Sequence, residues 1–422
     1  MISRQETLDL SREFGLNPNV VEKDYVLGWL LAGIFNHPAL RSSWVFKGGT
    51  CLKKCYFETY RFSEDLDFTV IDASHLKNDF LAPVFSEIGR WVYENSGIEL
   101  PVDIQRFDVY KNPRGQISVQ GRVGYRGPMQ RGGDLARVKL DLTDDEVLVL
   151  EPVQREVYHP YSDRPPGGFS ALCYSFEEVF AEKLRALTER ERPRDLYDVI
   201  HLYRHSEIRP DREVLRSTLE KKCAFKGIAV PSVASLENRP ERAELETEWA
   251  NMLGHQLPQL PPFEQFWREI PEVLSWVQGS TEKAVLASAP VGQDIDRSWQ
   301  PPPMIHAWYA RVPFEVIRFA AANRLCVDLR YQGSTRQIEP YSLRRTKEGA
   351  LLLFAVKHQS GELRSYRVDR IEGATATRVP FVPRYMVELT PAGGVYAPTT
   401  ARSTNPKPVR PRGQNSRTRR RR

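Results

Sequence analysis

Two neighbouring stretches, FKGGT at residues 46–50 and SEDLD at residues 63–67, decide the fold of this chain of 422 residues. The first completes a short apolar segment with the pattern of a strand. Its two glycines, Gly48 and Gly49, let backbone N–H groups approach a polyphosphate with no Cβ in the way. Paired glycines alone are most often a turn, so the prediction of a phosphate site depends on the second stretch as well.

The second stretch has the alternation of a strand, which places the carboxylates of Asp65 and Asp67 on one face. Such carboxylates repel each other unless a cation bridges them, and Mg²⁺ (or Mn²⁺) takes hard oxygen ligands while sharing its other sites with phosphates. Two bridged metals can activate an attacking hydroxyl and stabilise a leaving pyrophosphate. An Asp-x-Asp pair alone is usually a solvated strand face, but after the paired glycines it predicts a metal and nucleotide site.

A third carboxylate is expected on an adjacent strand. Asp141 fits, because it shares one face of an alternating apolar segment with Lys139. Taken alone, that segment is more typical of a surface ion pair, so Asp141 is a candidate only in combination with the acidic pair upstream.

A charged helical pair at residues 175–204, broken near Pro193, supplies cations. Lys183 lies on the first helix, and Arg194 and Asp195 open the second. A Lys or Arg that reaches a triphosphate neutralises the charge that develops on the leaving group. The alternative interpretation is a charged helix exposed to solvent.

The net charge is distributed unevenly along the chain. The 60 Lys and Arg against 54 Asp and Glu give +6 overall. Residues 397–422 hold nine of these cations and no acid, which leaves −3 on the remaining residues. This low-complexity end is expected to be disordered and to attract RNA or DNA in a salt-sensitive manner, a role in solubility being the alternative.

Composition excludes several classes of protein. The hydrophobic fraction of 41% and the charged fraction of 27% are ordinary for a globular protein. The longest apolar run, Val26–Phe35, has ten residues, whereas a membrane span needs about 20. The N-terminus lacks the apolar core of a signal peptide. Five cysteines, sparse and odd in number, predict a cytoplasmic protein without a disulfide framework.

The overall pattern predicts the α+β fold class, in two units. Residues 1–277 combine helical segments with strands and finish in helices, and residues 278–303 lack periodicity and run into three prolines, as a linker does. Residues 304–392 read as one helix followed by short alternating strands, the pattern of a small barrel. Residues 393–422 form the basic tail.

The motifs of the first unit resemble the abortive-infection nucleotidyltransferase toxins of the AbiEii/AbiGii and MenT-like type, in that family's order. They are Val21-Glu22-Lys23-Asp24-Tyr25, Phe46-Lys47-Gly48-Gly49-Thr50, Arg61-Phe62-Ser63-Glu64-Asp65-Leu66-Asp67, Lys139-x-Asp141, and Glu182-Lys183 through Asp198. The resemblance implies a nucleotidyltransferase fold of the DNA polymerase β superfamily with a helical C-terminal part. It also implies Mg²⁺-dependent transfer of a nucleotide from an NTP to an acceptor, the 3′ end of tRNA in some members, and a separate antitoxin as partner.

The resemblance also implies roles by position. The metal ligands would be Asp65, Asp67 and Asp141, and the catalytic set adds Lys183 and Asp195 to them. The nucleotide-binding residues would be Gly48, Gly49, Thr50, Ser63, Lys139, Lys183 and Arg194.

The second unit resembles a WYL-type domain, an Sm-like barrel of bacterial regulators and phage-defence proteins. The segments that carry the resemblance are 327–331, 338–341, 352–356 and 366–371, with Leu352-Leu353-Phe354 in place of the Trp-Tyr-Leu triplet. What it implies is a sensor that binds a ligand and regulates the attached enzyme. An excess of arginines indicates a nucleic acid or a nucleotide as that ligand, unless they are solvated rim charges. The candidate ligand-binding residues are Arg336, Arg344, Arg364, Arg367 and Arg370.

The sequence therefore predicts a nucleotidyltransferase toxin of phage defence or toxin–antitoxin type that transfers NMP to RNA, with tRNA as the expected acceptor. Two other functions stay open. The same chemistry can modify a protein hydroxyl, or the chain can be a nucleic-acid-binding regulator whose transferase half is a degraded scaffold. An antitoxin role is disfavoured because no expected carboxylate is missing.

Overall fold

The computed structural model describes residues 1–58, 60–130, 133–205, 210–237, 242–299 and 314–389. The predicted basic tail, the last residues of the predicted linker and the start of the second unit lie outside them. Within the described part, none of the helices combines the length and the apolar character that crossing a membrane requires.

A seven-stranded mixed sheet forms the centre of the first unit, in the order β3-β4-β5-β2-β1-β7-β6. The pairs β5–β2 and β1–β7 are parallel and the other neighbours are antiparallel. The strands are β1 (Trp44–Lys47), β2 (Asp65–Val70), β3 (Arg106–Lys111), β4 (Ile117–Tyr125), β5 (Ala136–Thr143), β6 (Val153–Glu156) and β7 (Ser170–Cys173).

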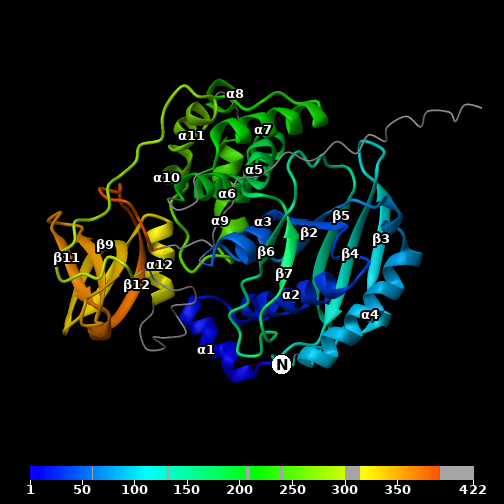
Figure 1. Cartoon of the computed structure of the whole chain (residues 1–422), viewed down its shortest axis with the longest axis horizontal. Coiled ribbons are helices and arrows are strands. Elements are labelled where there is room, and N and C mark those ends of the chain that lie inside the picture. Colours follow the sequence, from blue (N-terminus) through cyan, green and yellow to red (C-terminus); the bar gives the residue numbers. More distant parts are fainter. Residues whose placement is uncertain (59, 131–132, 206–209, 238–241, 300–313, 390–422) are drawn as a thin grey trace, which may run out of the picture.

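Three helices lie beside the sheet, and two of them, α2 and α4, pack against each other (Figure 1). They are α1 (Arg4–Phe14), α2 (Pro18–Asn36) and α4 (Asn78–Ser96). Helix α2 begins where the Asn17 side chain accepts a hydrogen bond from the backbone and proline occupies the first turn. Its residues from Tyr25 to Phe35 are all buried. The longest apolar run of the sequence is therefore the central helix of a protein core.

A second group of helices stands above the sheet in Figure 1, and within it α5 packs against both α6 and α7. Helix α5 ends at a residue in the left-handed conformation, Glu191 (φ 45°), and Pro193 opens α6, which turns the chain sharply between the two. The group consists of α5 (Phe176–Arg190), α6 (Pro193–Arg204), α7 (Arg212–Lys226), α8 (Val233–Glu237), α9 (Arg242–Leu253), α10 (Phe263–Trp267) and α11 (Ile270–Val277).

The second unit is a five-stranded antiparallel sheet, in the order β11-β10-β9-β8-β12, with α12 (Phe314–Ala322) packed on it. The predicted linker runs along this sheet, since Ile295 pairs with Thr346 and Asp296 with Arg345. The strands are β8 (Leu325–Tyr331), β9 (Ser334–Arg345), β10 (Leu351–Lys357), β11 (Leu363–Arg367) and β12 (Ile371–Pro380).

The predicted fold class, a mixed α and β first unit followed by an all-β sheet, is confirmed. Some strands differ from expectation. The alternation of residues 336–340 predicts a strand that ends at Pro340, yet β9 continues to Arg345, because a β-bulge opposite Phe354/Ala355 shifts the register next to that proline. Strands β6, β7 and β12 are not predicted, since the first two are four residues long and β12 is rich in Ala, Thr and Gly.

Candidate active site

Three carboxylates meet on one face of the central sheet. Asp65 and Asp67 lie two residues apart on β2 and therefore on the same face, and Asp141 of the parallel neighbour β5 is in register with Asp67. Lys139 is in register with Asp65 in the same ladder. On the other side of β5, Gln120 of β4 is in register with Asp141. The structure thus brings the predicted acidic set together, with Lys139 beside it.

The three carboxylates act on one another electrostatically. Burial, together with the negative charges of Asp141 and Asp65, raises the pKa of Asp67 from 3.8 to about 6. Burial and the charge of Asp65 also raise the pKa of Asp141. A carboxylate whose pKa is raised in this way ionises at a cost in free energy, and a neighbouring cation reduces that cost. The oxygen donors and their mutual repulsion therefore fit a hard divalent cation such as Mg²⁺.

The paired glycines lie directly against this acidic face. Strand β1 pairs with β2 so that Lys47 is in register with Asp67, and α3 (Gly48–Cys51) begins at the next residue. Gly48 has φ +78°, and a Cβ at this position would lie 2.0 Å from Oδ2 of Asp67. Two features require glycine at this position: the positive φ of the backbone and the carboxylate of Asp67, which leaves no space for a Cβ.

Replacement of this glycine is expected to destabilise the protein strongly. Gly48→Ala adds a steric clash with Asp67 to the strain of a positive φ, and we expect a loss of at least about 2 kcal/mol in unfolding free energy. Gly115 is a matched control, because it has φ +80° but no atom within 4 Å of the added Cβ. Gly115→Ala should cost only about 1 kcal/mol. Urea unfolding measures both, and equal losses would contradict the clash.

Thr50, Ser63 and Gly49 fix the turn to the acidic strand. The buried Thr50 hydroxyl donates a hydrogen bond to the carbonyl oxygen of Asp65 (2.5 Å), so it holds β2 in place. A Cβ on Gly49 would lie 2.4 Å from Nη2 of Arg61 and 3.1 Å from Oγ of Ser63. What the turn can offer a phosphate is therefore mainly its backbone N–H groups, with Ser63 at its edge.

A buried ion network supports the turn from behind. Arg61 donates to both carboxylate oxygens of Asp198, at 2.7 and 2.8 Å, and Tyr60 donates to the same carboxylate. Lys183 pairs with Asp198 at 2.8 Å and with Asp195 at 3.1 Å. Burial opposes the charged forms, yet the partners prevail: the pKa of Lys183 is raised by Asp198, and the pKa of Asp198 is lowered by Arg61. The predicted pair Lys183 and Asp195 thus lies in contact.

Other cations remain close to the acids. Arg194 is half-buried, and burial and the charge of Arg61 lower its pKa while Asp65 and Glu64 act in the opposite direction. Its Nε has no hydrogen-bond partner among the described residues. Lys47 lies 3.7 Å from both Glu146 and Glu182. Arg194 thus lies close enough to the acidic face to interact electrostatically with Asp65.

Sequence reasoning assigned no role to Lys47, Arg61 or Asp198, although all three stand inside the quoted motifs. Arg61 and Asp198 are 137 residues apart and pair only in the folded chain. Their signal in the sequence is an Arg four residues before the acidic strand and an Asp three residues after Asp195 on one helix face.

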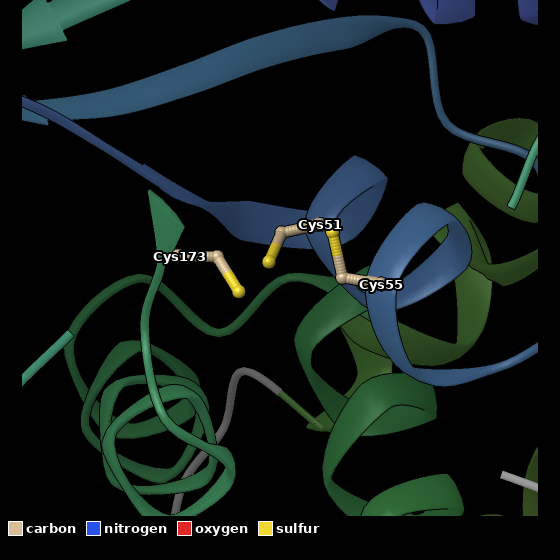
Figure 2. A group of neighbouring side chains, drawn as sticks. All are labelled: Cys51, Cys55 and Cys173. Atoms are coloured by element: carbon tan, nitrogen blue, oxygen red, sulfur yellow. The ribbon is translucent and has the colours of Figure 1, made fainter. Parts of the chain in front are cut away.

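Three cysteines gather behind the glycine turn. Cys51, Cys55 and Cys173 are buried free thiols, and their sulfurs all lie within 4.8 Å of one another. Figure 2 shows the sulfurs of Cys51 and Cys173 turned toward one another, with Cys55 on the next helical turn. Thiolates are donors for soft metals, whereas phosphate chemistry uses hard cations on oxygen. Buried thiols also pack as small apolar groups, and here they fill the core beneath α3.

The arginines predicted to bind a ligand on the second unit are dispersed. Arg336 donates to the carbonyl of Tyr331 (2.7 Å), Arg367 pairs with Asp369 (2.6 Å), and Arg344 pairs with Glu388. Arg364 pairs with Glu362, and Arg370 is exposed beyond the end of β11. Four of the five thus have partners within the chain, on different parts of the sheet.

Comparison with known proteins finds a family match in each unit. The family described as "Nucleotidyl transferase AbiEii toxin, Type IV TA system" matches residues 29–269, and the family described as "WYL domain" matches residues 313–376. The solved structure of MenT4, a nucleotidyltransferase toxin from Mycobacterium tuberculosis H37Rv, is similar over 66% of this chain and 90% of that chain, at 18% identity and a TM-score of 0.43. No curated protein sequence matches. The first match covers more than half of the chain and contains every residue of the acidic face.

Proposed function

We propose that this chain, which belongs to the AbiEii family of nucleotidyl transferase toxins, transfers a nucleoside monophosphate from an NTP to the 3′-hydroxyl of an RNA, with tRNA as the acceptor. The observation that carries the proposal is the acidic face of Asp65, Asp67 and Asp141 pressed against the Gly48 turn. A metal-binding set and a phosphate-binding turn in direct contact are what a reaction at an α-phosphate needs.

The reaction forms one bond and breaks one. The RNA 3′-oxygen attacks the α-phosphorus, the bond from that phosphorus to the bridging oxygen of the β-phosphate breaks, and pyrophosphate leaves. Asp65, Asp67 and Asp141 would hold Mg²⁺ or Mn²⁺, which when bound lowers the pKa of the attacking hydroxyl and screens the phosphate charge. The proton of the attacking hydroxyl passes to a carboxylate of this set, and Asp141, in register with Asp67 on the neighbouring strand, is the candidate acceptor.

The remaining residues of the site bind and orient. Backbone N–H groups at Gly48 and Gly49 hold the β- and γ-phosphates, and Arg194 approaches them from α6 with its unpaired Nε. Lys139 lies beside Asp65 on the open part of the face. Lys183 is already paired with two aspartates, so it acts by holding α5 and α6 against the turn.

The second unit is proposed to regulate this site. Its helix α12 reaches the transferase through the buried Arg318, which bonds to Glu58 at 3.0 Å. Glu58 lies just ahead of the segment that leads through Arg61 into the acidic strand. A displacement of α12 would therefore move Glu58, and the chain that follows Glu58 would transmit this movement to the catalytic residues of β2. An antitoxin is the expected protein partner, and the basic tail is expected to retain RNA near an otherwise acidic protein.

Incubation of the protein with each NTP labelled on its α-phosphate, total tRNA and Mg²⁺ or Mn²⁺ tests the proposal. One or more nucleotides should label the tRNA band on a denaturing gel that separates RNA from protein. Transfer should disappear when periodate has destroyed the terminal hydroxyls of the tRNA. Label in a protein band would make a protein hydroxyl the acceptor, and label in neither band under any condition would reject nucleotidyl transfer to both.

A further inference from the structure

A cavity of about 550 Å³ lies between the two units, away from the acidic face. The end of α6, the start of α7 and Trp276 of α11 form one wall, and α12 with residues 383–387 forms the other. Residues 282–286 of the connecting segment close a third side. We call this cavity the interdomain pocket. Its volume suits a ligand of the size of one nucleotide.

Two arginines stand at one end of the interdomain pocket, where Glu269 and Glu272 act on Arg324. Arg204 and Arg324 both line it and share one carboxylate, Glu269, with contacts of 2.7 and 3.0 Å. The Arg204 side chain is 5% exposed, and its Nη1 has no hydrogen-bond partner in the part of the chain that the structure describes. Burial, with the neighbouring Arg204 cation, lowers the pKa of Arg324 to about 10. A buried guanidinium with an unused donor favours an anion.

The remainder of the interdomain pocket is aromatic and apolar. Trp276 and Tyr203 stand 5.5 Å apart between ring centroids, and Tyr385 lies on the opposite wall. Ala321 and Ala322 of α12 leave space between these walls. A ligand with an aromatic ring and a phosphate would match both parts of the cavity. Its ring would stack between the aromatic walls, and its phosphate would contact the arginines.

Helix α6 joins the interdomain pocket to the acidic site. Asp195, Asp198, His201 and Arg204 follow one another at intervals of three along it, and all four side chains are buried. The first two belong to the ion network behind the glycine turn and the last two line the interdomain pocket. The ring of His201 also packs against that of Tyr60, which bonds to Asp198. Nine residues of helix span only about 14 Å.

Arg324 also lies at a strained point of the junction. Its backbone has φ 54°, the left-handed region that a residue with a side chain rarely adopts. The preceding Asn323 accepts a hydrogen bond from Gln265, so this junction is held by the transferase helices. This conformation ends α12, where the Arg324 N–H donates to the carbonyl of Ala321, and it fixes the point at which the Arg324 side chain leaves the helix.

We infer that the interdomain pocket binds a nucleoside monophosphate, with its phosphate on Arg204 and Arg324 and its base between Trp276 and Tyr385. Residues from both units line it, so an occupied pocket fixes their relative position. The binding can be tested whether or not the reaction proposed above is correct, whereas any effect on transfer rests on that reaction.

Calorimetric titration of the full chain with AMP, GMP, CMP or UMP in EDTA tests the inference, with inorganic phosphate as the probe that lacks a ring. At least one nucleotide should bind, and more tightly than phosphate. Ala322→Phe fills the cavity without removing an ion pair and should weaken binding by about tenfold or more. Arg204→Gln should do the same, and the urea midpoint shows whether either variant remains folded.

Arg194→Gln, at the acidic site, is the matched control and should bind the nucleotide as wild type does. Absence of binding by all four nucleotides at millimolar concentration would overturn the inference. Binding that survives Ala322→Phe would place the nucleotide outside the interdomain pocket, and binding that is lost in Arg194→Gln alone would place it at the acidic site. Either result would equally overturn the inference.

Discussion

Asp67→Asn is expected to reduce the rate of nucleotidyl transfer by about a thousandfold or more. The substitution keeps the shape of the side chain and removes one of the three charges that would hold the metal beside the α-phosphate. Asp65→Asn should have a loss of the same order, because both carboxylates lie on one face of β2. Initial rates with labelled NTP measure the effect, and a variant that retains a tenth of the wild-type rate would exclude Asp67 from metal binding.

The same substitution should stabilise the metal-free protein. Because the folded-state pKa of Asp67 is raised from 3.8 to about 6, its ionisation opposes folding. The penalty is absent below pH ~4, grows as the pH rises to ~6 and is then constant, at up to about 3 kcal/mol. Asp67→Asn should therefore gain stability over wild type in EDTA at neutral pH and gain nothing near pH 4, and Mg²⁺ should reduce the difference.

Asp108→Asn is the control for both measurements. Asp108 lies on β3 of the same sheet, 58% exposed and 3.3 Å from Arg122, so it shares the strand setting without the neighbouring carboxylates. Its removal should leave rate and stability within experimental error. An Asp67→Asn protein whose stability follows the wild-type pH profile throughout would show that the three carboxylates do not repel one another.

The local parts of the site could be predicted from the sequence, because short-range rules place them. Period two puts Asp65 and Asp67 on one face, and alternation puts Lys139 and Asp141 on the same face of β5. The glycine at position 48 could be anticipated too, as a position that excludes a side chain, although only the structure shows that the excluding atom belongs to Asp67.

The parts that could not be predicted depend on long-range pairing. Strand β7 is four residues long in a segment rich in Pro and Gly, and it is defined by its parallel pairing with β1. The partner of Arg61 lies 137 residues away, and the interdomain pocket has walls from both units. Helix α6 illustrates both cases. The spacing of three residues between Asp195 and Asp198 is visible in the sequence, but the ion network and the interdomain pocket at the two ends of the helix are not.

Asp198→Asn is expected to destabilise the protein by about 3–5 kcal/mol, because it removes the negative charge that pairs with the buried Arg61. Asp198 is fully buried and accepts from Arg61, Lys183 and Tyr60. Arg61 is only 2% exposed and has no access to water as a substitute partner. Because Arg61 lowers the pKa of Asp198, this stabilisation is present at neutral pH and is lost as the pH falls below about 4.

Asp195→Asn is the matched control, one helical turn earlier on the same face of α6. Its partner Lys183 keeps Asp198, and its partner Arg190 is 48% exposed, so water can replace the lost charge. The expected cost is about 1–2 kcal/mol, measured like that of Asp198→Asn by urea unfolding at neutral pH. Similar losses of unfolding free energy in the two variants would mean that Asp198 contributes no more to the stability of the ion network than Asp195 does. A larger loss for Asp198→Asn, with lower affinity for NTP, would show that Arg61 keeps the glycine turn in its phosphate-binding form, since its Nη2 occupies the space beside Gly49.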